Sequence, residues 1–181
     1  MKKPALALCA LLLATHGLFA DEPPGASWWE TKKGHLRSTW ESDNYAVLIP
    51  FNTYHVRATY DDDRLSEFNE MPWGLGIERY HFDEHRNRHS FFVLGFSDSW
   101  RDFQPALGYA WEKNFYYHDA RFGIGYSAML TGRRKNSYFP IPGIVPIASV
   151  GYKSLAIQTT WVPYLGHNNG NVFLTMFKWS I

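Results

Sequence analysis

The stretch "RFGIGYSAML", residues 121–130, alternates between two kinds of side chain. Because neighbouring residues on a β-strand project to opposite faces, one face carries Phe122, Ile124, Tyr126, Ala128 and Leu130. The other face carries two glycines, a serine and a methionine. A soluble β-sandwich buries its bulky apolar side chains, so this pattern is inverted, and it predicts lipid outside the sheet and a cavity inside it.

Strand-like segments of this kind recur along the chain, separated by turn-like breaks such as "DEHRNR" and "GHNNGN". There are eight, at about 46–60, 72–81, 90–99, 106–115, 121–131, 147–152, 154–162 and 171–181. Because an unpaired backbone group is costly in hydrocarbon, a sheet that spans a membrane must close on itself. The sequence therefore predicts an all-β fold, an eight-stranded antiparallel transmembrane β-barrel.

The first 20 residues, "MKKPALALCALLLATHGLFA", have the pattern of a secretory signal peptide. Lys2 and Lys3 precede an apolar core too short to span a bilayer, and the small residue Ala20 ends the stretch. Residues 21–181 are then a single exported barrel domain. The only cysteine, Cys9, lies in the signal peptide, so the exported chain has no disulfide and no thiol nucleophile.

An N-terminal amphipathic helix is expected at about 26–42, "ASWWETKKGHLRSTWES". Trp and Leu recur there at helical spacing beside basic residues, as in a helix that lies in a membrane interface. Gly34 lowers the helical propensity, so an irregular N-terminal arm is the alternative.

The overall composition excludes two other classes of protein. The chain has 18 Lys and Arg residues against 17 Asp and Glu residues, which gives no electrostatic basis for nucleic-acid binding. Its aromatic content is 18%, yet its mean hydropathy is -0.34, which excludes a helical membrane protein. We therefore expect no nucleic-acid partner.

Polar residues with catalytic potential fall near one rim of the predicted barrel. If both termini lie at the same end, odd-numbered segments run towards the other end, which places His55 there together with "GFSDSW", residues 95–100. An acidic side chain facing lipid at mid-depth costs several kcal/mol, whereas at the rim the cost largely disappears. Because adjacent residues on a strand point apart, a triad that uses both Asp98 and Ser99 requires the strand to bend or end there.

These residues lie within blocks that resemble the PagP family of lipid A palmitoyltransferases. The blocks occur in order over nearly the whole exported chain: "YHVRATYD", "NEMPWGLG", "FSDSW", "ALGYAWE", "SYFPIPGIVPIASVGY" and "NNGNVFLTMFKWSI". The resemblance implies a barrel behind an N-terminal helix, in the outer membrane of a Gram-negative bacterium. It implies transfer of a palmitoyl or similar long acyl chain from a phospholipid to lipid A, with His55, Asp98 and Ser99 as catalytic residues.

The resemblance also implies the partners of the protein. They are a phospholipid donor and a lipid A acceptor, and we expect a monomer without metal. One ester is exchanged for another, so no cofactor is expected. The possible roles stay open: His55 could be a general base, Asp98 could orient or charge-stabilise it, and Ser99 could be a nucleophile or an oxyanion donor.

Further substrate-binding residues follow from the same resemblance. Ala110 matches the floor of the family's acyl pocket, and a side chain larger than glycine there predicts a preference for chains no longer than palmitoyl. Arg64 in "DDDRLSE" matches a lipopolysaccharide contact, and Arg133 in "TGRRKN" is a candidate for phosphate pairing. His167 matches the phospholipid-gating position.

Four prolines lie in or beside predicted strands, at Pro50, Pro72, Pro146 and Pro163. Proline cannot donate a ladder hydrogen bond and is normally excluded from the interior of a sheet, so these residues mark gaps. In the family, prolines at matching positions flank lateral openings through which lipids enter.

The same residues allow other interpretations. "HFDEH", residues 81–85, fits the H-x-x-E-H zinc pattern, but that pattern needs a helix, and here a strand leads into a turn. His55 could be an ordinary rim histidine, and Asp98–Ser99 a simple turn start. The alternatives for the whole chain are a non-catalytic barrel, either adhesin or membrane anchor, and a lipid A deacylase.

Overall fold

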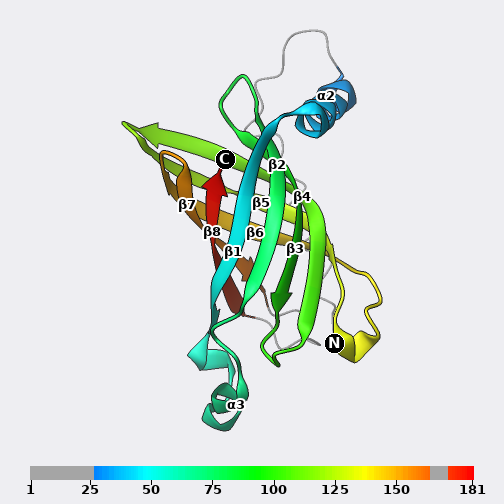
Figure 1. Cartoon of the computed structure of the whole chain (residues 1–181), viewed down its shortest axis with the longest axis vertical. Helices are drawn as coiled ribbons and strands as arrows, with labels where there is room; N and C mark the ends of the chain where they lie inside the picture. Colours follow the sequence, from blue (N-terminus) through cyan, green and yellow to red (C-terminus); the bar gives the residue numbers. More distant parts are fainter. Residues whose placement is uncertain (1–26, 164–170) are drawn as a thin grey trace, which may run out of the picture.

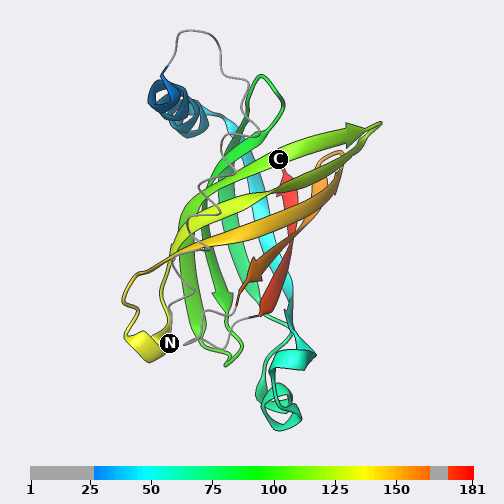
Figure 2. The same cartoon turned by 180° about the vertical axis from the view of Figure 1, so that it is seen from behind.

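The computed structural model describes residues 27–163 and 171–181, except for the side chain of Arg64. These residues form one closed antiparallel barrel in which each strand pairs with the next and β8 pairs with β1 (Figures 1 and 2). The strands are β1 Asn44–His55, β2 Gly74–Phe82, β3 Arg88–Ser97, β4 Phe103–Tyr117, β5 Ala120–Thr131, β6 Ile141–Tyr152, β7 Leu155–Val162 and β8 Val172–Ser180. The predicted eight-stranded barrel is confirmed.

The two faces of the wall have the inverted chemistry that the sequence predicts. On β5, Phe122, Ile124 and Leu130 are exposed to the outside, whereas Ser127 is buried inside. The same outward exposure of apolar side chains continues around the barrel at Leu75, Ile77, Val93, Leu107, Ile144, Val150, Ile157 and Phe177. This surface is suited to contact with lipid tails. Among the described residues, no helix is long and apolar enough to cross a membrane.

Helix α2, Trp28–Glu41, confirms the helix expected at the N-terminus. Ser27 caps it, accepting a hydrogen bond of 3.3 Å from the backbone N–H of Glu30 through its hydroxyl. The helix lies against the outside of β2 and β3, where Trp40 contacts the ring of Phe91 edge-on at 6.1 Å. Gly34 has open space where a side chain would project, so packing does not require the glycine.

The barrel has two distinct ends (Figure 1). At the α2 end lie helix α2 and the β2–β3, β4–β5 and β6–β7 turns. At the opposite end, which we call the His55 end, lie the short helix α3, Asp62–Glu67, and the 3-10 turns η2, Arg57–Thr59, and η3, Arg134–Asn136. The long connections, and with them most of the polar loop residues, are gathered at the His55 end.

Two strand boundaries differ from the prediction. The first strand ends at His55 rather than continuing to residue 60, because the η2 turn follows and the N–H of Val56 bonds to the carbonyl of Asn171 at 3.0 Å. β6 begins at Ile141, six residues before the predicted 147, because it pairs with β5 over its whole length. Pro142 and Pro146 are tolerated since the edge of β6 towards β7 is unpaired there.

Candidate active site

His55 and Ser99 come together at the His55 end of the barrel. His55 is the last residue of β1, and Ser99 stands two residues beyond the end of β3. The His55 Nε2 atom lies 2.8 Å from the Ser99 hydroxyl, a hydrogen bond between residues from two strands that are not neighbours. An imidazole within hydrogen-bond reach of a hydroxyl is the basic arrangement for general-base or nucleophilic catalysis.

Asp98 holds the turn that presents Ser99. Because β3 ends at Ser97, Asp98 and Ser99 are released from the alternation of a strand. The Asp98 carboxylate accepts backbone hydrogen bonds from Trp100 at 2.9 Å and from Asp102 at 3.0 Å. In the described part of the chain it forms no hydrogen bond with His55, so its visible role is to fix the Ser99 loop.

The acid that contacts His55 is Glu70, which sequence reasoning missed. Its Oε1 atom lies 3.4 Å from His55 Nδ1, and its Oε2 atom accepts a 2.7 Å hydrogen bond from Arg57. Burial disfavours the charged form of Glu70, but the hydrogen bonds from Arg57 and from the backbone of His55 hold its pKa below the usual value. Glu70 is therefore an anion beside the imidazole near neutral pH. It lies within the block "NEMPWGLG", but no residue pattern in that loop indicates its partner.

Aromatic side chains cover the imidazole. His55 is only 1% exposed, and its ring stacks on Phe68 with centroids 4.3 Å apart. Tyr60 contacts the same ring edge-on at 5.5 Å, and Trp100 contacts Phe68 at 5.3 Å. These contacts limit the access of water to the imidazole, whose Nε2 atom remains in contact with the Ser99 hydroxyl.

Inside the barrel a cavity extends from this end. It encloses about 640 Å³ of space between protein atoms, open solvent at its mouth included. Most of its walls are apolar, and they include Leu48, Phe92, Leu94, Phe96, Ala106, Ala110, Met129, Val162, Leu174 and Met176. Ala110 therefore does line the cavity, and it is 6% exposed.

Beyond the cavity, towards the α2 end of the barrel, the interior side chains are charged or polar. We call this region the polar plug, and it consists of Glu78, Arg88, Glu112, Gln158 and Lys178, each at most 8% exposed. Glu78 pairs with Arg88 and, at 3.1 Å, with Lys178, which also donates a 2.9 Å hydrogen bond to Gln158. A side chain at Gly123 would meet the Glu112 carboxyl group at 2.5 Å, so this glycine of the inward face makes room for the plug.

Strand pairing in the wall of the barrel is interrupted beside the four prolines at which the sequence predicts gaps. Pairing of β1 with β2 ends at Leu48–Gly76, although β1 continues past Pro50 and Pro72 precedes β2. On the other side of the barrel, pairing of β6 with β7 ends at Ile147–Thr160, beside Pro146 and before Pro163. Both interruptions occur towards the His55 end, in strands that are otherwise continuous.

Of the remaining predicted residues, Arg64 and Arg133 belong to the loops of the same end. Arg133 precedes η3 and is exposed, donating a 3.3 Å hydrogen bond to Gln104. Its neighbour Arg134 pairs with Asp102 at 2.9 Å. Arg64 lies in α3, but its side chain is not described, and His167 lies outside the described residues. The two histidines of "HFDEH" lie on β2 and in the turn after it.

The fold and the site define a small barrel with a histidine–hydroxyl pair at the end of an apolar interior cavity. The chain belongs to the PagP family: residues 35–178 match the model of "Antimicrobial peptide resistance and lipid A acylation protein PagP". Similar proteins from several bacteria carry the name "Lipid A acyltransferase PagP". That of Laribacter hongkongensis is 41% identical over 85% of this chain and 75% of its own. Those of Sodalis glossinidius, 37% identical over 94% and 95%, and Pantoea ananatis, 38% identical over 85% and 83%, are also similar. The predicted family and enzyme class are confirmed.

Proposed function

We propose that this protein transfers a palmitoyl or similar long acyl chain from a phospholipid to lipid A in the outer membrane of a Gram-negative bacterium. The observation that carries the proposal is the 2.8 Å contact between His55 and Ser99 above the apolar cavity. The names of the relatives support lipid A as the acceptor. The apolar outer surface supports a membrane location, where both lipids are available.

His55 moves the proton in the proposed reaction. A hydroxyl of lipid A attacks the ester carbonyl of the phospholipid, and the acyl C–O bond to glycerol breaks, leaving a lysophospholipid. His55 Nε2 takes the proton of the attacking hydroxyl and returns it to the leaving oxygen. Glu70 accepts the Nδ1–H hydrogen bond, which keeps the Nε2 lone pair directed towards the reacting oxygen and stabilises the imidazolium as it forms. Glu70 is thus proposed as a positioning residue.

The contact between Ser99 and His55 is compatible with two routes of acyl transfer. As a nucleophile it would lose its proton to His55 and carry the acyl chain as an ester; as a donor it would hydrogen-bond the oxyanion of direct transfer. The routes differ in one observable. Incubation with phospholipid alone produces a protein mass increased by one acyl group on the covalent route and an unchanged mass on the direct route.

The cavity is proposed to hold the acyl chain of the donor, with Ala110 and the polar plug closing its far end. Each additional CH2 group gains about 0.8 kcal/mol when buried among apolar walls, but not against buried charges. Because Ala110 matches the floor of the family's acyl pocket and is larger than glycine, we expect transfer of chains no longer than palmitoyl. The two interruptions of the wall are proposed as lateral entries for the lipids, and Arg133 as a contact for lipid A phosphate.

The test is mass spectrometry of lipid A from cells that express the chain, its His55→Ala variant or no copy. The proposal predicts a mass gain of one long acyl chain with the unaltered protein only. An unchanged mass would favour the non-catalytic barrel, and a mass loss would favour a lipid A deacylase. A gain that persists in His55→Ala would exclude the proposed base while leaving acyl transfer in place.

A further inference from the structure

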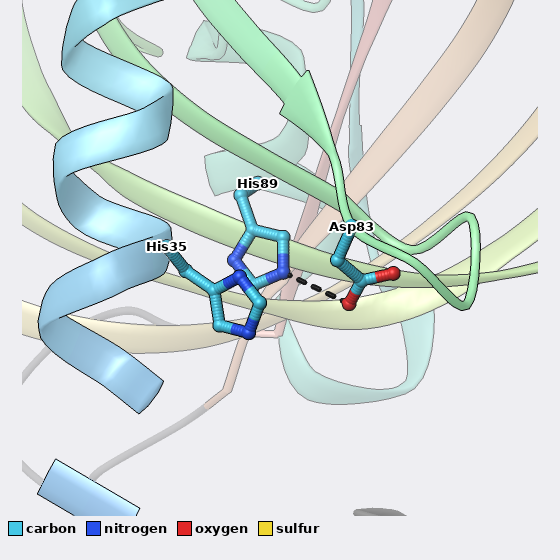
Figure 3. Close-up of side chains that lie close together, drawn as sticks. All are labelled: His35, Asp83 and His89. Carbon is cyan, nitrogen blue, oxygen red and sulfur yellow. Dashed lines mark hydrogen bonds and ion pairs between the residues drawn. The ribbon is translucent and has the colours of Figure 1, made fainter. Parts of the chain in front are cut away.

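Three potential metal ligands meet at the α2 end of the barrel, away from the acyl-transfer site. They are His35 on α2, Asp83 in the β2–β3 turn and His89 on β3 (Figure 3). Their ligand atoms all lie within 4.8 Å of one another. Residues 35 and 83 are far apart in the sequence, and they meet only because α2 lies against the outside of β2 and β3.

Asp83 is held in a fixed position. Its carboxylate accepts hydrogen bonds from the backbone N–H groups of His85 at 2.9 Å and Asn87 at 2.8 Å, and from the Asn87 side chain at 3.0 Å. These three hydrogen bonds fix the orientation of the carboxylate before any ion binds, as ligating carboxylates usually require.

His89 is oriented from its other side. The residue is 1% exposed, and its Nδ1 atom lies 2.5 Å from the Tyr109 hydroxyl. This contact directs Nε2 towards Asp83, whose Oδ2 atom lies 3.1 Å away. Histidines that bind metals usually form a hydrogen bond of this kind through the second ring nitrogen, and it fixes the orientation of the ring.

His35 supplies the third ligand from the helix. Its ring stacks on that of His89, with centroids 4.3 Å apart and an angle of 21° between the planes. One of its ring nitrogens lies within 4.8 Å of the ligand atoms of Asp83 and His89. Two stacked rings cannot both direct a lone pair at one ion, so binding requires the His35 ring to rotate out of the stack.

We propose that His35, Asp83 and His89 bind one divalent ion of the zinc class, which fastens α2 to the barrel. Two imidazoles and a carboxylate are a ligand set that suits Zn²⁺, at bond lengths of about 2.0–2.2 Å. Those lengths place tetrahedral ligand atoms about 3.4 Å apart, close to the 3.1 Å between His89 and Asp83. The ion replaces the proton shared by these two groups, which leaves to solvent. His81, whose ring centroid is 6.3 Å from that of His89, or a water completes the coordination.

The ion would strengthen a limited attachment. Near its C-terminal end α2 is held by the hydrogen bond from Arg79 to the carbonyl of Trp40 and by a 2.6 Å bond from Ser42 to Tyr80. A metal bound at His35 would anchor the helix one turn and a half earlier. Because only the folded arrangement brings the three ligands together, binding stabilises that state.

The experiment is a calorimetric titration of Zn²⁺ into the full exported chain in detergent micelles, with thermal unfolding in parallel. We expect one equivalent of zinc, proton release seen as a dependence of the heat on buffer, and a rise of Tm on the order of 5 °C at saturation. His35→Ala and Asp83→Asn are each expected to lose the saturable binding and the rise. The matched control is His85→Ala, which removes an exposed histidine from the same turn and should leave both unchanged.

Two results would overturn the site. Zinc binding that survives both His35→Ala and Asp83→Asn, or that His85→Ala abolishes, would place the ion elsewhere. No binding to the unaltered chain would leave the cluster as a histidine–aspartate hydrogen bond covered by a stacked ring. His35→Ala retains the His89–Asp83 bond, and its unfolding curve in chelator verifies that lost binding is not lost folding.

Discussion

The cavity and the polar plug lie in the same barrel but differ in polarity: the walls of the cavity are mostly apolar, and the side chains of the plug are charged or polar. Leu48, Leu94 and Met176 form the apolar cluster of the cavity, whereas Glu78, Arg88 and Lys178 form an ion-paired cluster below it. The backbone pairing of the strands is the same kind of framework around both. The difference shows that the wall provides the fold, and that the inward side chains decide whether a region of the interior is apolar or charged.

The largest expected effect breaks the chemistry at the mouth of the cavity. His55→Ala removes the base and should lower acyl transfer by about 10²- to 10⁴-fold while the barrel still folds. Transfer from a labelled phospholipid in detergent measures the rate, and the heat-dependent gel migration of the barrel checks the fold. A rate within tenfold of the unaltered protein would contradict the role given to His55.

The second-largest expected effect is a loss of stability when the ion pairs of the polar plug are removed. Glu78→Ala leaves Arg88 and Lys178 buried without their shared anion, which should destabilise the folded state by about 3–5 kcal/mol. Denaturant unfolding in detergent measures this loss. The matched control is Glu41→Ala on α2, where an exposed ion pair with Arg37 is lost and a much smaller change is expected. Equal effects of the two variants would argue against a structural plug.

A smaller effect distinguishes the two acids near His55. Glu70→Gln removes the charge at Nδ1 and should lower transfer about tenfold, moving the acidic limb of the pH–rate profile to lower pH. The limb moves downward because His55 loses the anion that favours its protonated form. In Asp98→Asn the side chain can still accept the two turn hydrogen bonds, so the limb should stay in place. A shift in Asp98→Asn alone would make Asp98 the positioning acid instead.

The smallest expected effect is a change in the preferred length of the donor chain when the side chain at Ala110 is changed. Ala110→Leu adds three carbons to the wall beside Ser127, so the preferred donor chain should become shorter by a few CH2 groups. Ala110→Gly should allow chains at least as long as before. Competition among phospholipids of different chain length measures the preference. An unchanged preference in both variants would place the floor of the cavity elsewhere.

The sequence predicts the barrel well because its evidence is local. The alternation in residues 121–130 is set by strand geometry, and the structure confirms the outward Phe122 and the inward Ser127. The end of the first strand is less predictable, because residues 56–60 still alternate although tertiary contacts turn the chain there.

The site is predicted less completely, because its contacts depend on loops. His55 and Ser99 were named from the family blocks, and the structure brings them together. Glu70 was missed since its approach to His55 depends on the path of residues 56–73, which follows no sequence period. The meeting of His35 with His89 likewise depends on where α2 docks, which the helix sequence alone does not specify.

The two interruptions of strand pairing have a mechanical consequence. Towards the His55 end they divide the wall into one arc of β2 to β6 and another arc of β7, β8 and β1. Towards the α2 end the two arcs are joined by continuous strand pairing. Among the described residues no ladder pairing joins the arcs at that level. Across the β1–β2 seam they are joined instead by the Thr53 N–H, which donates to the Glu70 carbonyl at 2.9 Å, and by the 2.8 Å contact between His55 and Ser99. Amide hydrogens of β1 and β6 that face the two seams should exchange with deuterium sooner than those in the middle of β4 and β5, where every neighbour is paired.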